Sequence, residues 1–216
     1  MVRLMGLFFI TIPLVLTNFS RNSDAAGTTK TMVLVLVDAL RPDHIGSYGY
    51  SKPTSPNIDR LAQEGSRYTR VYANAPWTRP STASFLTGLN ASQHRTETAK
   101  SKLPKNVKTL AERLRKKGWM TAGFVANGNG GSLAGLDKGF HLFRDPTNYY
   151  TKSKRGKTYN GLPRGELIVE DSLKWLKRQK EKNVFLFLFL VDPHDPYRAP
   201  IRLEKAFLPK GYKGKI

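Results

Sequence analysis

The chain of 216 residues contains no cysteine. Disulfide bonds, thiolate metal sites and a cysteine nucleophile are therefore excluded for this polypeptide. Acidic residues are scarce, because 16 Asp and Glu stand against 36 Lys and Arg, giving a formal net charge of +20. The charge is unevenly distributed, because residues 1–99 contain ten basic and six acidic side chains, whereas residues 100–216 contain 26 basic and ten acidic side chains. A field this positive favours anionic partners such as nucleic acid, acidic lipid, polysaccharide or anionic esters, without choosing among them.

Long apolar runs are missing beyond the first 16 residues, so no later segment is expected to span a membrane. At the start, Arg3 precedes 13 mainly apolar residues, and Ser23 and Ala25 follow at the spacing of a cleavage site. This order is typical of a secretory signal peptide, so we interpret residues 1–25 as one, removed after Ala25. The alternatives are an uncleaved anchor or a mistaken start codon. We expect an exported protein, periplasmic or extracellular, without a membrane anchor after cleavage.

The apolar content of 39% is enough for one packed domain. Continuous apolar runs predict buried strands at 32–37, 119–126 and 184–191, with 68–72 as a further short candidate. Apolar residues at helical spacing predict helices at 56–65, 107–118 and 166–180, the first with Ser55 as its N-cap. Residues 126–139 and 152–157 have the composition of loops. Strands that alternate with helices predict an α/β domain with a mainly parallel sheet.

Polar residues that could bind a ligand follow two of these strands. In parallel sheets, ligands bind beyond the carboxyl ends of the strands. Asp38 comes directly after the first strand, and Asp192 and His194 come after the last. A carboxylate in such a place suits a hard metal ion, although a lone Asp38 is more often a cap or turn residue. His194 stands between two prolines and has the alternative role of fixing that turn.

A third candidate lies in residues 75–88, APWTRPSTASFLTG. Pro80 suits the first turn of a helix, with Arg79 held extended before it. Thr78 would then precede a helix amino terminus, where free amides and the helix dipole favour anions. A hydroxyl beside a metal ion at that point could act as a nucleophile. The spacing alone favours a simpler interpretation, in which Thr78 and Ser81 only cap the helix.

Five segments, in this order, resemble the amino-terminal part of the sulfatase family within the alkaline-phosphatase-like superfamily. They are VDALRPDHIGSYGY (37–50), TSPNIDRLAQEGSRYTRVYA (54–73), APWTRPSTASFLTG (75–88), KTLAERLRKKGWMTAGFVAN (108–127) and VDPHDPYRAP (191–200). The resemblance implies a three-layer α/β sandwich with a mainly parallel central sheet. It also implies a divalent metal, usually Ca²⁺, with Asp38 as a metal ligand. Thr78 falls at the nucleophile position and His194 near the bound sulfate or phosphate.

Three positions depart from the family pattern. Sulfatases use a Cys or Ser that is oxidised to formylglycine, and the Thr78 present here cannot give that aldehyde, so formylglycine is not expected. Thr82 replaces the family arginine, and Ala39 replaces a frequent second aspartate. An unmodified Thr78 is more similar to the phosphoesterase and phosphotransferase branches of the superfamily, in which the hydroxyl attacks phosphorus directly.

Length is the largest departure, because the family's later Asp-His-Gly segment is missing. Calcium takes 6–8 oxygen ligands, which Asp38 and Thr78 cannot supply. We therefore expect an incomplete catalytic domain over residues 26–216, in which 184–191 is left as an exposed apolar edge strand. The leading hypothesis is a metal-dependent hydrolase of sulfuric esters with an anionic ester substrate. The alternatives are a phosphoesterase or phosphotransferase acting through Thr78, and an inactive exported protein that binds polyanions. No specific nucleic acid is expected, because no recognition motif accompanies the charge.

Overall fold

A computed structural model describes residues 29–150, 158–159, 162–180 and 182–195, together with residues 197, 199, 203, 207–208, 211–212 and 214. The expected signal peptide and the expected loop at 152–157 lie outside the described residues. The described part divides into two compact units. One unit is residues 41–71, and the other is residues 29–40 together with those from 72 onward. Each unit is treated separately below.

The smaller unit contains η1 (Pro42–His44), η2 (Gly46–Tyr48) and α1 (Pro56–Glu64). Ser55 stands at the N-cap of α1 as predicted, and its Oγ accepts a hydrogen bond from Gly46 N at 2.9 Å. The predicted strand at 68–72 does not form. Tyr68 O instead accepts a hydrogen bond from the Tyr48 hydroxyl at 2.8 Å, so its carbonyl is satisfied without a neighbouring strand.

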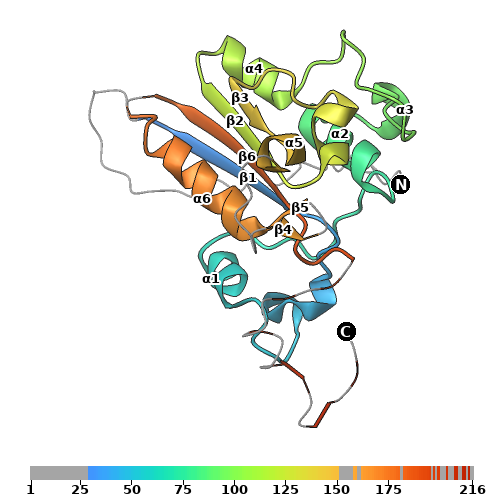
Figure 1. The fold of residues 1–216 in the computed structure, drawn as a ribbon, viewed down its shortest axis with the longest axis vertical. Coiled ribbons are helices and arrows are strands. Elements are labelled where there is room, and N and C mark those ends of the chain that lie inside the picture. The colour runs from blue at the N-terminus through green and yellow to red at the C-terminus, as the bar shows by residue number, and fades with distance from the viewer. Residues whose placement is uncertain are drawn as a thin grey trace, which may run out of the picture. The chain divides into compact units, whose positions relative to one another are not determined.

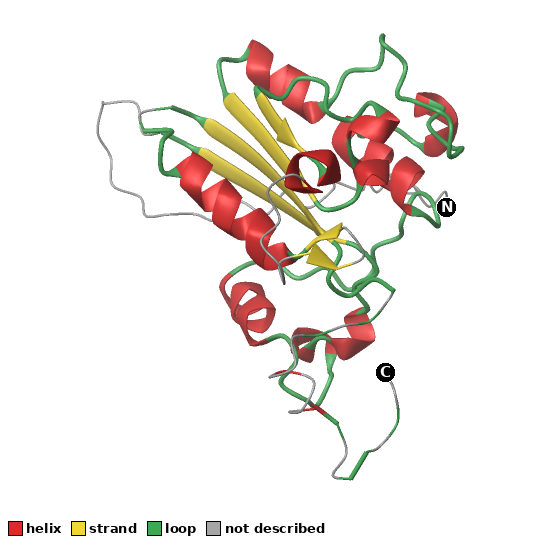
Figure 2. Ribbon diagram, in the orientation of Figure 1, coloured by secondary structure: helices red, strands yellow, loops and turns green. Residues whose placement is uncertain are grey.

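The larger unit is built on a four-stranded parallel sheet in the order β1-β6-β2-β3. These strands are β1 (Thr31–Val37), β2 (Met120–Val125), β3 (Leu142–Arg144) and β6 (Val184–Leu190). Figure 2 shows their arrows side by side and pointing the same way. The carboxyl ends of all four strands therefore lie at one edge of the sheet, which we call the carboxyl edge, and the amino ends lie at the opposite amino edge.

Helices cover both faces of this sheet, as the alternation along β6 requires (Figure 1). Phe185, Phe187 and Phe189 pack with residues of α2 (Thr78–Thr87) and α4 (Leu110–Lys116). Leu186 and Leu188 point to the opposite face and pack with residues of α5 (Pro146–Tyr150) and α6 (Gly165–Leu176). The expected three-layer α/β fold with a parallel central sheet is therefore confirmed.

The remaining elements are short: α3 (Ala91–His94), η3 (Gly128–Gly130), η4 (Ser132–Ala134), β4 (Thr158–Tyr159) and β5 (Leu162–Pro163), the last two antiparallel. The helix predicted at 107–118 begins later, at Leu110, because Thr109 and Glu112 form a capping box. Thr109 Oγ1 accepts from Glu112 N at 3.1 Å, and Glu112 Oε2 accepts from Thr109 N at 3.0 Å. Over the described positions, no helix combines the length and apolar character needed to cross a membrane.

Two expectations about strand burial are wrong. β6, expected as the exposed edge, lies in the interior between β1 and β2 and is buried along nearly its whole length. β1, expected to be buried on both faces, is the edge strand, and Val33 and Val35 are 40% and 49% exposed. Among the described residues of the larger unit, α6 packs over β6 and β2 and leaves alternate side chains of β1 exposed.

Candidate active site at the carboxyl edge

Asp38 extends the strand pairing by one residue beyond β1. Its backbone N donates to Leu190 O at 2.8 Å, so the residue remains attached to the end of β6. The chain then turns at Ala39, whose φ of 55° lies in the left-handed region that non-glycine residues rarely adopt. The hydrogen bond and the turn together place Asp38 at the carboxyl edge of the sheet, as the sequence predicts.

Thr78 is the first residue of α2, and its hydroxyl contacts Asp38. Thr78 Oγ1 donates to Asp38 Oδ2 at 3.1 Å, which joins two residues that are 40 positions apart. Trp77 occupies the N-cap position, and no side chain caps the helix. The simpler interpretation, in which Thr78 and Ser81 cap α2, is therefore wrong. Arg79 is helical and not extended as expected before a proline, because it forms part of the first turn of α2.

The sequence interpretation missed the side chain of Arg79, which is only 4% exposed. Its Nη1 donates to Ser101 O at 2.8 Å, and its Nη2 donates to Asn129 Oδ1 at 2.8 Å. A buried charge of this kind is costly unless its donors are paired. The guanidinium thus ties the first turn of α2 to residue 101 and to η3, and so helps to fix the position of Thr78. The one local signal was an arginine directly beside the nucleophile candidate.

Asp192 and His194 follow β6 as expected, but neither contacts Asp38 or Thr78 in the described part of the chain. Both Asp192 carboxylate oxygens accept from Gly165 N, at 3.0 and 3.1 Å, so this side chain lies at the amino end of α6. His194 is exposed, and its Nδ1 donates to Asp195 O at 2.6 Å. That hydrogen bond places the ring proton on Nδ1 and leaves Nε2 as an available acceptor.

The carboxyl edge does not form a complete calcium site from the residues described. Asp38 and Thr78 bring one carboxylate and one hydroxyl together, fewer than the 6–8 oxygens that calcium takes. No cluster of three or more His, Asp or Glu suited to a metal occurs among the described residues. Asp192 is also already engaged at the amino end of α6.

This chain belongs to the sulfatase family, whose model matches residues 30–212. Among curated proteins it is similar to an arylsulfatase of Clostridium perfringens, with 29% identity over 162 residues. That alignment covers 72% of this chain and 32% of the relative. The chain thus spans a third or less of the length of the curated relatives that it matches most strongly.

Solved structures share the fold of this chain. A protein of the alkaline phosphatase superfamily from Vibrio parahaemolyticus matches with a TM-score of 0.63 and 24% identity, covering 82% of this chain and 44% of that one. A protein solved in complex with its substrate D-glucosamine-2-N,6-O-disulfate matches with a TM-score of 0.69 and 20% identity, covering 84% of this chain and 39% of that one. Both matches bear out the expected α/β architecture.

Proposed function

We propose that this chain is part of an exported, metal-dependent hydrolase of sulfuric esters, with residues 1–25 as its signal peptide. The observation that supports the proposal most directly is the hydrogen bond from Thr78 to Asp38 at the carboxyl edge. Membership of the sulfatase family supports the reaction class. Calcium is the proposed metal, with Asp38 as one of its ligands; when bound, it would offset negative charge on the ester.

Thr78 is the proposed nucleophile. Because its hydroxyl donates to Asp38, both oxygen lone pairs stay available for attack. The first amides of α2 have no side-chain cap, so the helix dipole and the free N–H groups can bind an anionic ester beside Thr78. In the proposed step, Thr78 Oγ1 bonds to sulfur, the ester S–O bond breaks, and the hydroxyl proton passes to Asp38. The departing oxygen takes a proton from a water molecule, which becomes hydroxide. The hydroxide attacks the sulfur of the intermediate, the bond from sulfur to Thr78 Oγ1 breaks, Thr78 takes its proton back from Asp38, and hydrogen sulfate leaves.

His194 is proposed to contact the bound sulfate or phosphate. The hydrogen bond from Nδ1 to Asp195 O leaves Nε2 of the exposed ring available to a ligand. Its place four residues beyond the end of β6 puts it after the same edge of the sheet as Asp38. His194→Ala should therefore weaken substrate affinity more than it lowers the maximal rate.

The test is turnover of 4-nitrophenyl sulfate by the purified intact hydrolase that contains this chain, with and without added calcium. We expect calcium-dependent release of 4-nitrophenol that falls about 10²-fold or more in Thr78→Ala. Thr87→Ala is a matched control, because it removes a threonine hydroxyl at the opposite end of α2. Absence of turnover with and without calcium, or equal turnover in Thr78→Ala, would refute the proposal.

The unmodified Thr78 favours a second candidate, a phosphoesterase or phosphotransferase. A threonine hydroxyl can attack phosphorus directly, whereas it cannot give the formylglycine aldehyde. The discriminating experiment offers 4-nitrophenyl phosphate and bis(4-nitrophenyl) phosphate beside the sulfate and analyses quenched protein by mass spectrometry. A phosphate adduct on Thr78 supports the second candidate, whereas release of sulfate without that adduct supports the first.

A further inference from the structure

The amino edge of the parallel sheet brings together segments that are far apart in the sequence. Lys30 N donates to Asn183 Oδ1, Val184 N donates to Lys30 O, and Met120 N donates to Asn183 O, each at 2.8 Å. These bonds hold the starts of β1, β6 and β2 side by side at the amino edge of the sheet (Figure 1). Asp38 and Thr78 lie at the opposite, carboxyl edge. Any charges in the segments that precede these strands must therefore lie near one another.

The segments before these strands, together with α4, are rich in exposed cations. We call the following residues the amino-edge basic surface: Lys30, Arg113, Arg115, Lys116, Lys117 and Lys182. All six are exposed. The ion pairs within the described part of the chain include none of them. Among the described residues, the surface is therefore a concentration of cations that form no ion pair.

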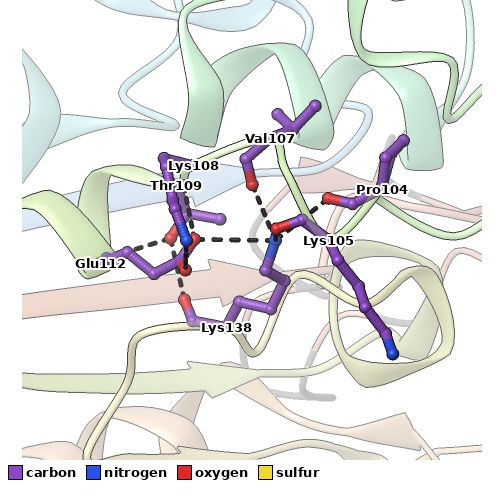
Figure 3. Close-up of polar contacts among 7 residues, drawn as sticks. All are labelled: Pro104, Lys105, Val107, Lys108, Thr109, Glu112 and Lys138. Atoms are coloured by element: carbon purple, nitrogen blue, oxygen red, sulfur yellow. Dashed lines mark hydrogen bonds and ion pairs between the residues drawn. The ribbon is translucent and has the colours of Figure 1, made fainter.

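Part of this surface is hollowed. A cavity of about 550 Å³ lies beside α4 and is lined by Lys108, Glu112, Arg113, Arg115, Lys116 and Gly139. Its one carboxylate, Glu112, is already engaged by Lys108 at 3.2 Å and by Lys138 at 3.7 Å, as Figure 3 shows. The other charged groups of the lining are cations, so the cavity attracts anions. Its volume falls in the usual range of ligand pockets.

The cavity and the strand starts form one continuous field. Burial of the ring lowers the pKa of His141, and the positive charges of Arg115 and Lys182 lower it further. These two cations come from α4 and from the segment before β6, and both act on the same ring next to β3. In addition, α4 ends only four residues before β2 begins, and Met120 at that start donates its backbone N–H to Asn183 O at 2.8 Å. The basic end of α4 therefore lies beside the strand starts, and an extended polyanion can contact the cavity and the strand starts at the same time.

The chemistry of the surface favours a sulfated polysaccharide over other polyanions. Described residues 113–120, 177–180 and 182–184 expose no large apolar side chain. The exposed apolar side chains that follow Lys30 are Val33 and Val35, which are smaller than the Trp, Phe and Leu anchors typical of membrane-binding surfaces. None of these residues exposes an aromatic ring on which a nucleic-acid base could stack. We propose that the amino-edge basic surface binds a sulfated polysaccharide chain, separately from the candidate active site. The choice of sulfate as the anion rests on the proposed function.

The test is the affinity of the purified 216-residue protein for immobilised heparin and for chemically desulfated heparin in about 0.15 M salt. We expect sulfate-dependent binding that weakens as salt is raised. A variant with Lys30, Arg115, Lys116 and Lys182 all changed to Gln should bind about tenfold or more weakly. The matched control changes Lys52, Lys100, Lys102 and Lys105 to Gln, which lowers the net charge equally at exposed positions elsewhere. Its affinity should stay within about twofold of the parent.

Equal loss in the two variants would show attraction by net charge alone and would overturn the proposal. Tighter binding to phosphatidylserine vesicles or to DNA than to heparin at the same salt would also overturn it. Circular dichroism and the denaturant midpoint verify that both variants fold. Thr78→Ala separates this proposal from the proposed function, because it should bind heparin like the parent. Binding retained by a protein without esterase activity supports this surface while refuting the catalytic proposal.

Discussion

Thr78 Oγ1 donates a hydrogen bond to Asp38 Oδ2 at 3.1 Å, although the two residues are separated by 40 positions. The contact exists because Asp38 ends the pairing of β1 with β6, while Thr78 begins the helix that packs over the same sheet. A hydroxyl and a carboxylate are thus held together where ligands bind in parallel sheets. The pair can be tested by separating its hydrogen bond from its charge.

Asp38→Asn keeps an oxygen that can accept from Thr78 but removes the negative charge. We expect turnover to fall about 10²-fold or more, because an amide cannot take the hydroxyl proton or bind calcium as a carboxylate does. The free energy of unfolding should change by about 1 kcal/mol or less, since one partly buried hydrogen bond is involved. Initial rates and urea denaturation measure the two effects. Unchanged turnover in this variant would contradict a functional charge at residue 38.

Much of this arrangement is predictable from local patterns. The places of Asp38 after a strand and of Thr78 near a helix start follow from the sequence, whereas their proposed roles follow from the resemblance to the sulfatase family, because position alone favours a cap or turn residue. The hydrogen bonds of the buried Arg79 side chain cannot be predicted from local patterns. Its partners Ser101 and Asn129 lie 22 and 50 positions away, and only the folded chain brings them together. The order of the strands also depends on contacts between distant residues. The apolar runs of β1 and β6 are similar in sequence, but of these two strands only β6 has a neighbouring strand on each side.

A buried histidine predicts how stability depends on pH. His94 is fully buried; its Nδ1 accepts from Thr96 N at 3.0 Å, and its Nε2 lies 3.0 Å from Ser84 Oγ. Burial lowers the pKa of His94 below 6.5. The unfolded chain therefore takes up a proton in a pH range where the folded protein does not. The contribution of this residue is fully present above pH 6.5 and decreases as the pH falls below it.

The measurement is urea denaturation between pH 7.5 and pH 5. We expect the free energy of unfolding to fall with pH by at most about 1.4 kcal/mol per pH unit from this group. His94→Gln should make the free energy of unfolding depend less on pH, and it should lower the free energy of unfolding at pH 7.5. An equal slope in the parent and in His94→Gln would assign the pH dependence to other groups.

The ammonium of Lys138 fixes the segment that leads into α4. Its Nζ donates to the carbonyl oxygens of Pro104, Lys105 and Val107 at 3.1, 3.2 and 2.7 Å, as Figure 3 shows. Lys138→Met leaves these carbonyls and Glu112 without that partner, so the free energy of unfolding should fall by about 1–3 kcal/mol. Lys105→Met is the matched control, because its ammonium points away from the cluster (Figure 3). Similar losses in both variants would contradict a specific role for Lys138.

Ala39 offers a test of both the strained turn and the incomplete metal site. With φ at 55°, an alanine there costs roughly 1–2 kcal/mol, and Asn or Asp tolerates this conformation better. Ala39→Asn and Ala39→Asp should both raise the free energy of unfolding, by up to about 1 kcal/mol. Only the aspartate adds a second carboxylate beside Asp38, so calorimetry should find at least about tenfold tighter calcium binding for Asp than for Asn. Equal calcium affinity in the two variants would mean that residue 39 does not face the metal.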